Sequence, residues 1–550
     1  MSNLSKIRRD KMIEFLETLK EQHSDDESLI AINQIEKELV SKRYGLVWEE
    51  HEEAVDAMMR DNIPVFTEVK EREICVVPGE DYNFLLEGDN LHSLHLLEKI
   101  HRGKVDVIYI DPPYNTGGKD FVYNDTCIDR TDGYRHSKWL SFMCERLVIA
   151  KKLMSDIGLI FISIDDNEVA QLKLLCNEIF GEENFRGQIA RGTGTPTGQG
   201  NAILSNEIDY ILVYAKTQQA YFNGLPFDDE SSKIYNLEDE YGKYLNRPLR
   251  KTGGEDRRED RPSMFYPIKA PDGTDIYPIA PSGYESRWRC QKSTYEQLCK
   301  EHRIEWKRDE SGWKIYQKFY LEGRTKQPGN LWSNVEGNKK ATITIKNIMG
   351  TSGFSFPKPV EVIVRILQIA GNKDSVVLDF FAGSGTTAQA VLELNKEDGG
   401  QRKFILCTNN ENNICEEITY QRIKTVITGK RQDGSDYSEG IPANLKYYHT
   451  DFVPKSEEYL ADSLLNHVTE MIQLEHGIRI DDDSYIMIMS DDDADELEKK
   501  WNEYTDIIAI YVSQDVLLTA SQEALFGSVD TYIIPDYYFN FELREAGELW

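Results

Sequence analysis

Short apolar runs alternate along the chain with longer segments in which apolar residues recur at helical spacing. Such runs are typical of strands buried on both faces of a parallel sheet, and the longer segments indicate amphipathic helices. The predicted strands cover residues 105–110, 158–164, 208–215, 375–380 and 403–407. The predicted helices cover residues 139–154, 169–180, 359–370 and 388–394. This alternation predicts an α/β fold with a doubly wound sheet.

The pattern changes at both ends of the chain and in its middle. Residues 1–75 carry apolar residues at helical spacing and predict a helical N-terminal module. Over residues 217–350, short pieces rich in tyrosine and tryptophan alternate with Gly, Pro and Asp turns, which predicts an inserted, mainly β domain. The α/β pattern is thereby divided into two halves, residues 76–216 and 351–450, and residues 451–550 form a C-terminal extension.

Charge is distributed unevenly over the 550 residues. The formal net charge is −31, which by itself argues against a nucleic-acid partner. Residues 241–350, however, hold 22 Lys and Arg against 14 Asp and Glu, whereas residues 451–550 hold 5 against 24. Because nucleic-acid binding needs a local positive surface rather than a positive total, the insertion is the candidate nucleic-acid-binding segment. The acidic C-terminal extension is expected to be an interaction domain.

Several classes of protein are disfavoured by the sequence. It has no run of about 18 apolar residues, so no membrane association through a spanning helix is expected. Its first residues lack the apolar core of a signal peptide, so a cytoplasmic location is expected. The eight cysteines and ten histidines do not occur at zinc-binding spacings, so no metal site is predicted.

The first candidate for chemistry directly follows the predicted strand at 105–110. Asp111-Pro112-Pro113-Tyr114 cannot continue the strand, because prolines lack a backbone donor and fix φ. The motif therefore places a carboxylate and an aromatic ring at the carboxyl end of a strand, where open α/β sheets bind ligands. Taken alone, it is also compatible with an ordinary strand-to-loop turn that has a satisfied aspartate.

A glycine-rich turn after the strand at 375–380 is the second candidate. Its glycines allow a ligand to approach the backbone closely, and the following helix offers free N–H groups. It lacks the Gly-Lys-Ser/Thr ending of a nucleotide-binding loop and the third glycine of a dinucleotide site. Asp379 at the strand end instead suits a cofactor with an amine or hydroxyls. The candidate ligand-binding residues of the turn are Phe381, Ala382, Gly383, Gly385 and Thr386.

Together the two motifs resemble those of the DNA amino-methyltransferases that use S-adenosylmethionine. In that family Asp-Pro-Pro-Tyr is the catalytic loop and Phe-x-Gly-x-Gly is the methyl-donor loop. Here the catalytic loop comes first and the basic insertion follows, as in the β group, whose insertion is the target recognition domain. The resemblance is closest to the modification (Mod) subunits of type III restriction-modification systems. It implies a Rossmann-like methyltransferase sheet in circularly permuted order, with a helical N-terminal and an acidic C-terminal extension.

The resemblance also implies roles for individual residues. The loop at residues 111–114 would be catalytic. Two further stretches match the family, Gly88-Asp89-Asn90-Leu91 before the catalytic strand and Phe356-Pro357-Lys358-Pro359 before the donor strand. Together with the donor loop they imply a pocket for S-adenosylmethionine, formed by Asp89, Asn90, Lys358, Pro359, Asp379, Phe381, Ala382, Gly383, Gly385 and Thr386. The family commonly has an acidic ribose ligand after the next strand, and here either Asn409 or Glu411 could serve.

The reaction that the resemblance implies is methylation of adenine N6 in duplex DNA after base flipping. Asp111 and the Pro112 carbonyl would accept hydrogen bonds from the amine, and Tyr114 would stack on the base. Aspartate at the first position favours adenine N6 over cytosine N4, so a cytosine-N4 DNA methyltransferase and an RNA methyltransferase are the alternatives. A homodimer and a restriction partner with helicase and nuclease activity are further implications.

Overall fold

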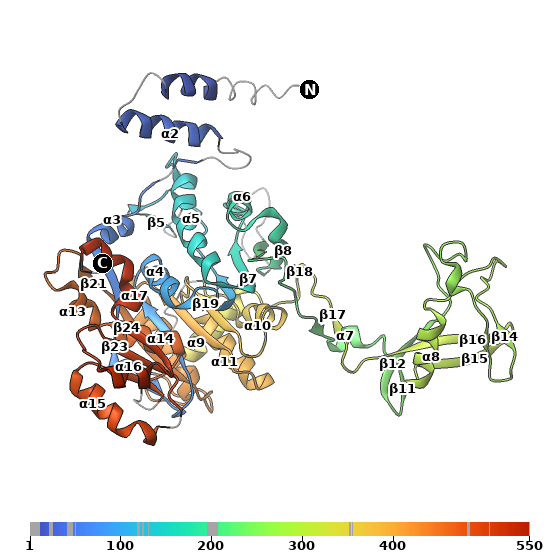
Figure 1. Cartoon of the computed structure of the whole chain (residues 1–550). Helices are drawn as coiled ribbons and strands as arrows, with labels where there is room; N and C mark the ends of the chain where they lie inside the picture. The colour runs from blue at the N-terminus through green and yellow to red at the C-terminus, as the bar shows by residue number, and fades with distance from the viewer. Residues whose placement is uncertain are drawn as a thin grey trace. The chain divides into compact units, whose positions relative to one another are not determined.

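The computed structural model describes most of the chain. The described residues are 12–20, 26–40, 48–49, 51–117, 121–123, 126–129, 131–194, 207–350, 354, 356–480, 484–504 and 506–548. The chain divides into two compact units, Met1–Tyr221 with Gly329–Trp550, and Phe222–Pro328 (Figure 1). None of the helices in the described ranges combines the length with the apolar character that crossing a bilayer requires.

The larger unit is built around one mixed sheet. Its strands are β1 (Asn62–Glu68), β2 (Ile74–Cys75), β3 (Tyr82–Glu87), β4 (Val105–Ile110), β7 (Met154–Ile164), β8 (Phe185–Gly192), β9 (Ile208–Ala215), β18 (Leu331–Trp332), β19 (Val376–Asp379), β20 (Lys403–Thr408) and β21 (Asn444–Pro454). They occur in the order β1-β21-β3-β20-β19-β4-β7-β9-β8-β18, and β2 pairs with β21. The strands from β21 to β7 in this order are parallel, whereas β9 runs antiparallel to both of its neighbours. Outside this sheet, a short hairpin is formed by β5 (Val122–Tyr123) and β6 (Thr126–Cys127).

Helices cover the sheet in two layers. In the larger unit, the helices labelled before the C-terminal region are α2 (Asp26–Val40), α3 (Ala54–Asp61), α4 (Asn90–His101), α5 (Arg135–Leu153), α6 (Val169–Phe180), α9 (Asn338–Met349), α10 (Val360–Ile369), α11 (Thr386–Asp398) and α12 (Tyr420–Thr428). One layer joins α4, α5 and α6, and the other joins α10, α11, α12 and α9. Along β4, Ile108 and Ile110 belong to the core under α4–α6, whereas Val107 and Tyr109 are buried on the opposite face. This is the doubly wound α/β arrangement that the sequence predicts.

The prediction of a helical module over residues 1–75 is wrong for its last part. Residues 12–20, α2 and α3 are helical, but β1 and β2 belong to the main sheet. Ile63 and Val65 of β1 are buried there. The partner of β1 is β21, which lies almost at the other end of the chain, so local periodicity does not reveal the strand.

The smaller unit has a mainly β structure of its own. Its elements are β10 (Leu225–Pro226), α7 (Asp229–Ser232), β11 (Leu237–Asp239), β12 (Gly242–Pro248), β13 (Ile268–Lys269), β14 (Asp275–Ile276), α8 (Lys292–Lys300), β15 (Ile304–Asp309), β16 (Gly312–Tyr320) and β17 (Thr325–Lys326). Four of the strands form an antiparallel sheet in the order β11-β12-β16-β15. The predicted end of the insertion at residue 350 is wrong, because the smaller unit ends at residue 328. The chain then returns to the larger unit, where β18 joins the sheet and α9 buries Ile345 and Ile348.

The C-terminal region shares the core of the larger unit. Its elements are α13 (Leu460–Leu465), α14 (Val468–His476), β22 (Tyr485–Ile488), α15 (Asp491–Lys500), β23 (Ala509–Ser513), α16 (Ala520–Phe526), β24 (Asp530–Ile534) and α17 (Asp536–Ala546). The three strands form a small parallel sheet. Tyr511, Phe539 and Leu543 join the same hydrophobic core as β3 and α4. The predicted boundary at residue 451 is therefore wrong, because it falls inside β21. The acidic region has a small hydrophobic cluster of its own, which includes Ile488 and Phe526, but its other buried apolar residues belong to the main core.

Candidate active site

The two candidate motifs follow neighbouring strands of the main sheet. β4 and β19 pair in parallel, with Val107 opposite Val377 and Ile108 opposite Leu378. Their carboxyl ends therefore meet at one edge of the sheet, where ligands of open α/β folds bind. The sheet thus brings together two loops that the sequence separates by the whole insertion.

A cavity of about 530 Å³, called here the first cavity, lies between these loops. This volume is in the range of roughly 300–1,000 Å³ that is usual for small-ligand sites. The first cavity is lined by seven of the predicted site residues, Asp89, Asn90, Asp111, Pro112, Pro113, Phe381 and Gly383. Asn409 and Glu411, the two candidates for a ribose ligand, also line it.

The charge of the first cavity indicates which kind of ligand fits. Among the described residues that line it, Glu53, Asp89, Asp111 and Glu411 are acidic and none is basic, and several phenylalanine rings complete the wall. A pyrophosphate would meet repulsion there, whereas a ligand with cationic groups and hydroxyls would be stabilised by carboxylates and aromatic faces. The residues present therefore fit S-adenosylmethionine, which carries a sulfonium, an ammonium and two ribose hydroxyls.

Other predicted cofactor residues lie behind the glycine loop and shape it. Asp379 is buried, and its carboxylate accepts hydrogen bonds from the Phe381 amide at 3.0 Å and from the Thr387 hydroxyl. Burial raises the pKa of Asp379 to about 7. Asp379 does not line the first cavity. It therefore supports the loop, whereas the sequence suggested that it contacts the ligand.

Four more predicted residues shape the glycine loop and its surroundings and do not line the first cavity. Gly385 caps α11 in the left-handed conformation with a φ of 74°, and Pro359 caps α10. The Ala382 amide donates to the Cys407 carbonyl at 3.1 Å, and the Thr386 hydroxyl donates to the Lys358 carbonyl at 3.3 Å. These contacts tie the glycine loop to the next strand and to the segment before α10.

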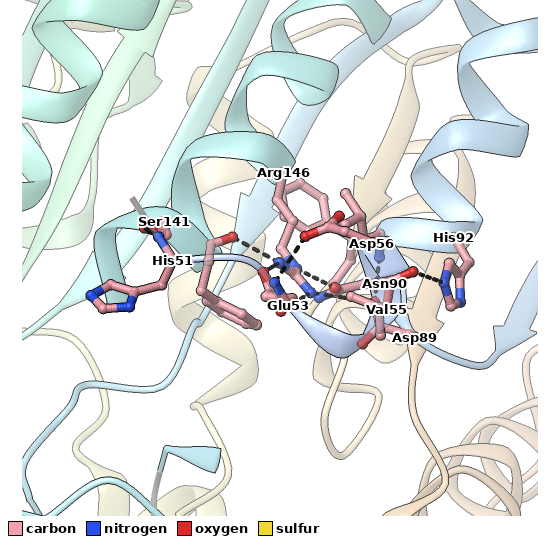
Figure 2. A network of polar contacts seen from close by, with 12 residues as sticks. His51, Glu53, Val55, Asp56, Asp89, Asn90, His92, Ser141 and Arg146 are labelled. Atoms are coloured by element: carbon pink, nitrogen blue, oxygen red, sulfur yellow. Dashed lines mark hydrogen bonds and ion pairs between the residues drawn. The ribbon is translucent and has the colours of Figure 1, made fainter. Parts of the chain in front are cut away.

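A buried arginine, Arg146 of α5, organises one wall of the first cavity (Figure 2). Its guanidinium donates to both carboxylate oxygens of Glu53, at 2.6 and 3.2 Å, to Asn90 Oδ1 at 2.5 Å and to Asp89 Oδ1 at 3.3 Å. It also lies over the Phe142 ring, 3.8 Å from the centroid. Burial raises the pKa of Glu53, and the Arg146 charge opposes that shift. One buried cation thus orients four side chains that line the first cavity.

A second cavity of about 480 Å³ adjoins the first. The two share Asp111, Pro112 and Phe356, and the second is further lined by Tyr114 and Asp209, among others. Asp209 is itself held by a bidentate ion pair to a buried arginine of β8, Arg191, which also donates to Asn338 Oδ1 at 3.0 Å. The second cavity therefore has a polar wall that is fixed in place.

The position of Lys358 differs from the prediction. Its ammonium lines the second cavity, where it donates to Asp111 Oδ1 and to the Tyr114 hydroxyl, each at 2.6 Å. The prediction that its side chain lines the donor pocket is not supported by this geometry, because the Asp111 carboxylate attracts the ammonium to the other cavity. Burial raises the pKa of Tyr114 well above its ordinary value, so the hydroxyl stays protonated.

The sequence reasoning missed several residues of the site. Glu53 precedes α3, in the segment expected to form a separate helical module, and Arg146 comes from the middle of a predicted helix. A signal for Arg146 does exist in the sequence. It stands one turn from Met143 and Ala150, both of which are buried, and therefore lies on the apolar face of its helix. A charged residue on that face must find buried partners.

Comparisons with known proteins point to one family. A family model described as DNA methylase matches residues 105–421. The Mod subunit of the type III restriction-modification enzyme StyLTI from Salmonella typhimurium is 36% identical over 420 residues, which cover 69% of this chain and 62% of that subunit. The EcoPI Mod subunit of Escherichia phage P1 is 35% identical over 444 residues, 70% of this chain and 68% of that protein. The type II methyltransferase M.KpnI of Klebsiella pneumoniae is 37% identical over 351 residues, 61% of this chain and 82% of that protein.

The extent of these matches decides the family. The chain spans less than two thirds of the StyLTI subunit but more than two thirds of the EcoPI subunit and of M.KpnI. The family model covers more than half of the chain and includes both loops of the site. The chain therefore belongs to the DNA methylase family.

Proposed function

We propose that this protein transfers a methyl group from S-adenosylmethionine to N6 of adenine in duplex DNA, as the modification subunit of a type III restriction-modification system. The first cavity holds the methyl donor and the second holds the flipped adenine. The Mod subunits among its relatives and the Asp-Pro-Pro-Tyr loop support this proposal. A DNA substrate also implies a cytoplasmic location.

The observation that carries the proposal is the wall between the two cavities. Asp111 and Pro112 line both of them, so groups bound in the two cavities meet at these residues. Methyl transfer from sulfur to nitrogen is an in-line displacement that depends mainly on such positioning. A single cavity would serve a binding protein equally well, whereas two cavities with a shared carboxylate suit a two-substrate transfer.

The residues of the second cavity would prepare the amine for attack. An exocyclic amine is a weak nucleophile because its lone pair is delocalised into the ring. Asp111 and the Pro112 carbonyl accept its hydrogens, which draws the nitrogen toward a tetrahedral geometry. A carboxylate has about four lone-pair sites, so Asp111 can accept from the amine while Lys358 is bound. Tyr114 stacks on the base, a contact worth about 1–3 kcal/mol.

The residues of the first cavity would hold the donor. When bound, S-adenosylmethionine supplies an electrophilic methyl group. Glu53 and Asp89, both held by Arg146, stabilise cationic groups, and Asn409 or Glu411 accepts the ribose hydroxyls. Trp139 Nε1 donates to the Pro113 carbonyl at 2.7 Å, which keeps the catalytic loop in place beside the first cavity.

The smaller unit, together with the rest of the basic segment at residues 241–350, serves as the target recognition domain. Most of this unit lies in the segment 241–350, which holds 22 Lys and Arg against 14 Asp and Glu, and that excess supplies the local positive surface that duplex DNA requires. In the wider assembly, the protein forms a homodimer and pairs with a restriction subunit that has helicase and nuclease activity. The order of the two loops along the chain makes the sheet a circularly permuted methyltransferase sheet.

Substitution of Gly385 by alanine should weaken donor binding. Gly385 has a φ of 74°, and an added Cβ would lie 3.2 Å from Thr419 Cγ2. The left-handed conformation costs a residue with a side chain about 1–2 kcal/mol, so we expect the Kd for S-adenosylmethionine, measured by calorimetry, to rise about tenfold. Gly399→Ala is the matched control, because Gly399 has a φ of 67° at the other end of α11 with no atom near the added Cβ. Equal losses of donor affinity in both variants would contradict the role of Gly385.

Transfer of tritiated methyl groups tests the proposed function. The full chain is incubated with labelled S-adenosylmethionine and, separately, with duplex DNA or RNA, and the labelled base is identified after digestion. We expect N6-methyladenine in duplex DNA, with salt-sensitive binding. Labelled N4-methylcytosine, or label in RNA alone, would replace the proposal with one of the two alternatives.

A further inference from the structure

The residue after the catalytic tyrosine is held by a buried carboxyl group. Asn115 is fully buried and has a φ of 55°, a left-handed conformation in which asparagine is enriched. Its Nδ2 donates to Glu168 Oε1 at 2.6 Å and to the Arg135 carbonyl at 3.3 Å. Glu168, immediately before α6, is also fully buried. The backbone next to Tyr114 therefore depends on the contact between Asn115 and Glu168.

A histidine beside Glu168 indicates where the hydrogens of this cluster lie. Arg135 Nε donates to His136 Nε2 at 3.2 Å, so Nε2 acts as the acceptor of the ring. Burial and the Arg135 charge lower the pKa of His136, which keeps the ring neutral. Nδ1 then carries the hydrogen and donates to Glu168 Oε1 at 2.5 Å. Oε1 of Glu168 thus accepts two hydrogen bonds.

Two other buried atoms of the cluster have no hydrogen-bond partner. They are Glu168 Oε2 and Asn115 Oδ1. If Glu168 were ionised, both atoms would be acceptors, and leaving them buried without donors would cost about 1–3 kcal/mol each. Asn115 and Glu168 are already joined through Nδ2 and Oε1, so a proton on Oε2 would turn that oxygen into a donor and could supply the hydrogen that Asn115 Oδ1 lacks. One proton therefore satisfies both atoms.

We propose that Glu168 is a positioning residue that carries a proton on Oε2 and, as a neutral acid, donates to Asn115 Oδ1 and so holds the catalytic loop in its active geometry. The amide and the acid then form two hydrogen bonds in opposite directions. Loss of the proton leaves Oε2 and Oδ1 as facing acceptors and loosens Asn115. This inference rests on the proposed methyl transfer, whose rate depends on the placement of Asp111 and Tyr114.

The charged groups that face Glu168 come from two sides. Arg135 and His136 approach from the start of α5, and Asp165 lies on the loop after β7. Burial raises the pKa of Glu168 to about 8, opposed by the Asn115 hydrogen bond and the Arg135 charge and assisted by Asp165. Because the pKa is raised, Glu168 is neutral below pH 8 and loses its proton above it. We therefore expect the rate of transfer to fall above about pH 8.

Three variants compared over a pH series test the role of Glu168. Glu168→Gln keeps an acceptor and a donor for Asn115 but cannot ionise, so we expect a rate near that of the wild type at pH 7 and no decline above pH 8. Glu168→Leu should lower kcat about 100-fold at every pH, the usual effect of a misplaced catalytic group, with little change in the Kd for S-adenosylmethionine. Glu178→Leu, at an exposed position of α6, is the control and should behave like the wild type.

These outcomes separate the proposal from its competitors. If Glu168 instead formed an ion pair with a charged His136, Glu168→Gln would be as impaired as Glu168→Leu, and the proposal would fail. It would also fail if wild type and Glu168→Gln shared one pH profile. Infrared spectroscopy adds a readout that needs no activity, because the wild type should show the carbonyl band of a protonated acid that Glu168→Gln lacks. If the wild type methylates no nucleic acid, the proposed function fails, while the infrared band still decides whether Glu168 is protonated.

Discussion

Replacing Asp111 with alanine is expected to abolish methyl transfer while leaving S-adenosylmethionine binding nearly unchanged. Asp111 lines both cavities, but the walls that hold the donor come mainly from the glycine loop and from the side chains around Arg146. The lost carboxylate would have accepted a hydrogen of the amine, and Lys358 would be left as an unpaired cation beside the base. We expect kcat to fall at least about 1,000-fold, or roughly 4 kcal/mol in the barrier.

Two further variants make this result interpretable. Asp111→Asn keeps one acceptor oxygen and should retain more activity than Asp111→Ala, whereas Asp156→Ala removes a carboxylate at the surface and should leave kcat unaltered. The measurements are incorporation of tritiated methyl groups and calorimetry of donor binding. Transfer by Asp111→Ala at the wild-type rate would refute the assigned role of Asp111.

Replacing Arg146 with methionine is expected to lower both the free energy of unfolding and the affinity for S-adenosylmethionine. Removing one partner of a buried ion pair typically costs about 3–5 kcal/mol, because the other charge stays buried without compensation. Glu53 and Asp89 would lose their cation together. We expect a lower melting temperature and a Kd for S-adenosylmethionine at least about tenfold higher, since these side chains line the first cavity.

The pH dependence of the Arg146→Met variant provides a sharper test. Burial already raises the pKa of Glu53, and the Arg146 charge opposes that shift. Removing Arg146 should therefore raise this pKa further. The deficit in melting temperature should therefore be smaller at pH 5 than at pH 8, and the added change Glu53→Gln should remove much of that difference. Arg102→Met, which removes an exposed ion pair to Glu98, is the control. Equal losses of melting temperature in Arg146→Met and Arg102→Met would show that Arg146 does not organise the site.

Local patterns in the sequence were enough to predict the middle of the fold. The apolar run at 208–215 and the helix at 169–180 match β9 and α6 residue for residue. β9 buries most of its side chains, and α6 buries one apolar face that includes Leu172, Leu175 and Cys176, so hydrophobic periodicity predicts both elements directly. β1 was missed because its place in the sheet depends on β21, and the end of the insertion was misplaced because α9 packs on the larger unit.

The site was predictable as two loops but not as two cavities. Asp111, Tyr114, Phe381 and Gly383 belong to contiguous motifs, and the structure brings them together. Which way a side chain turns within a motif depends on distant partners. Lys358 turns toward Asp111, and Glu53 reaches Arg146 across 93 positions of the chain. No spacing rule links such residues before the sheet is assembled.

The way the chain enters and leaves the smaller unit bears on how these proteins diversify. β10 and β17, at the two ends of that unit, pair with each other, with Leu225 opposite Lys326 and Pro226 opposite Thr325. The segments by which the chain enters and leaves the smaller unit thus pair with each other as antiparallel strands. A different unit grafted between these paired strands would leave β4, β19 and their loops undisturbed. Under the proposed function, selection could therefore exchange the recognition unit while the two loops of the site are inherited unchanged.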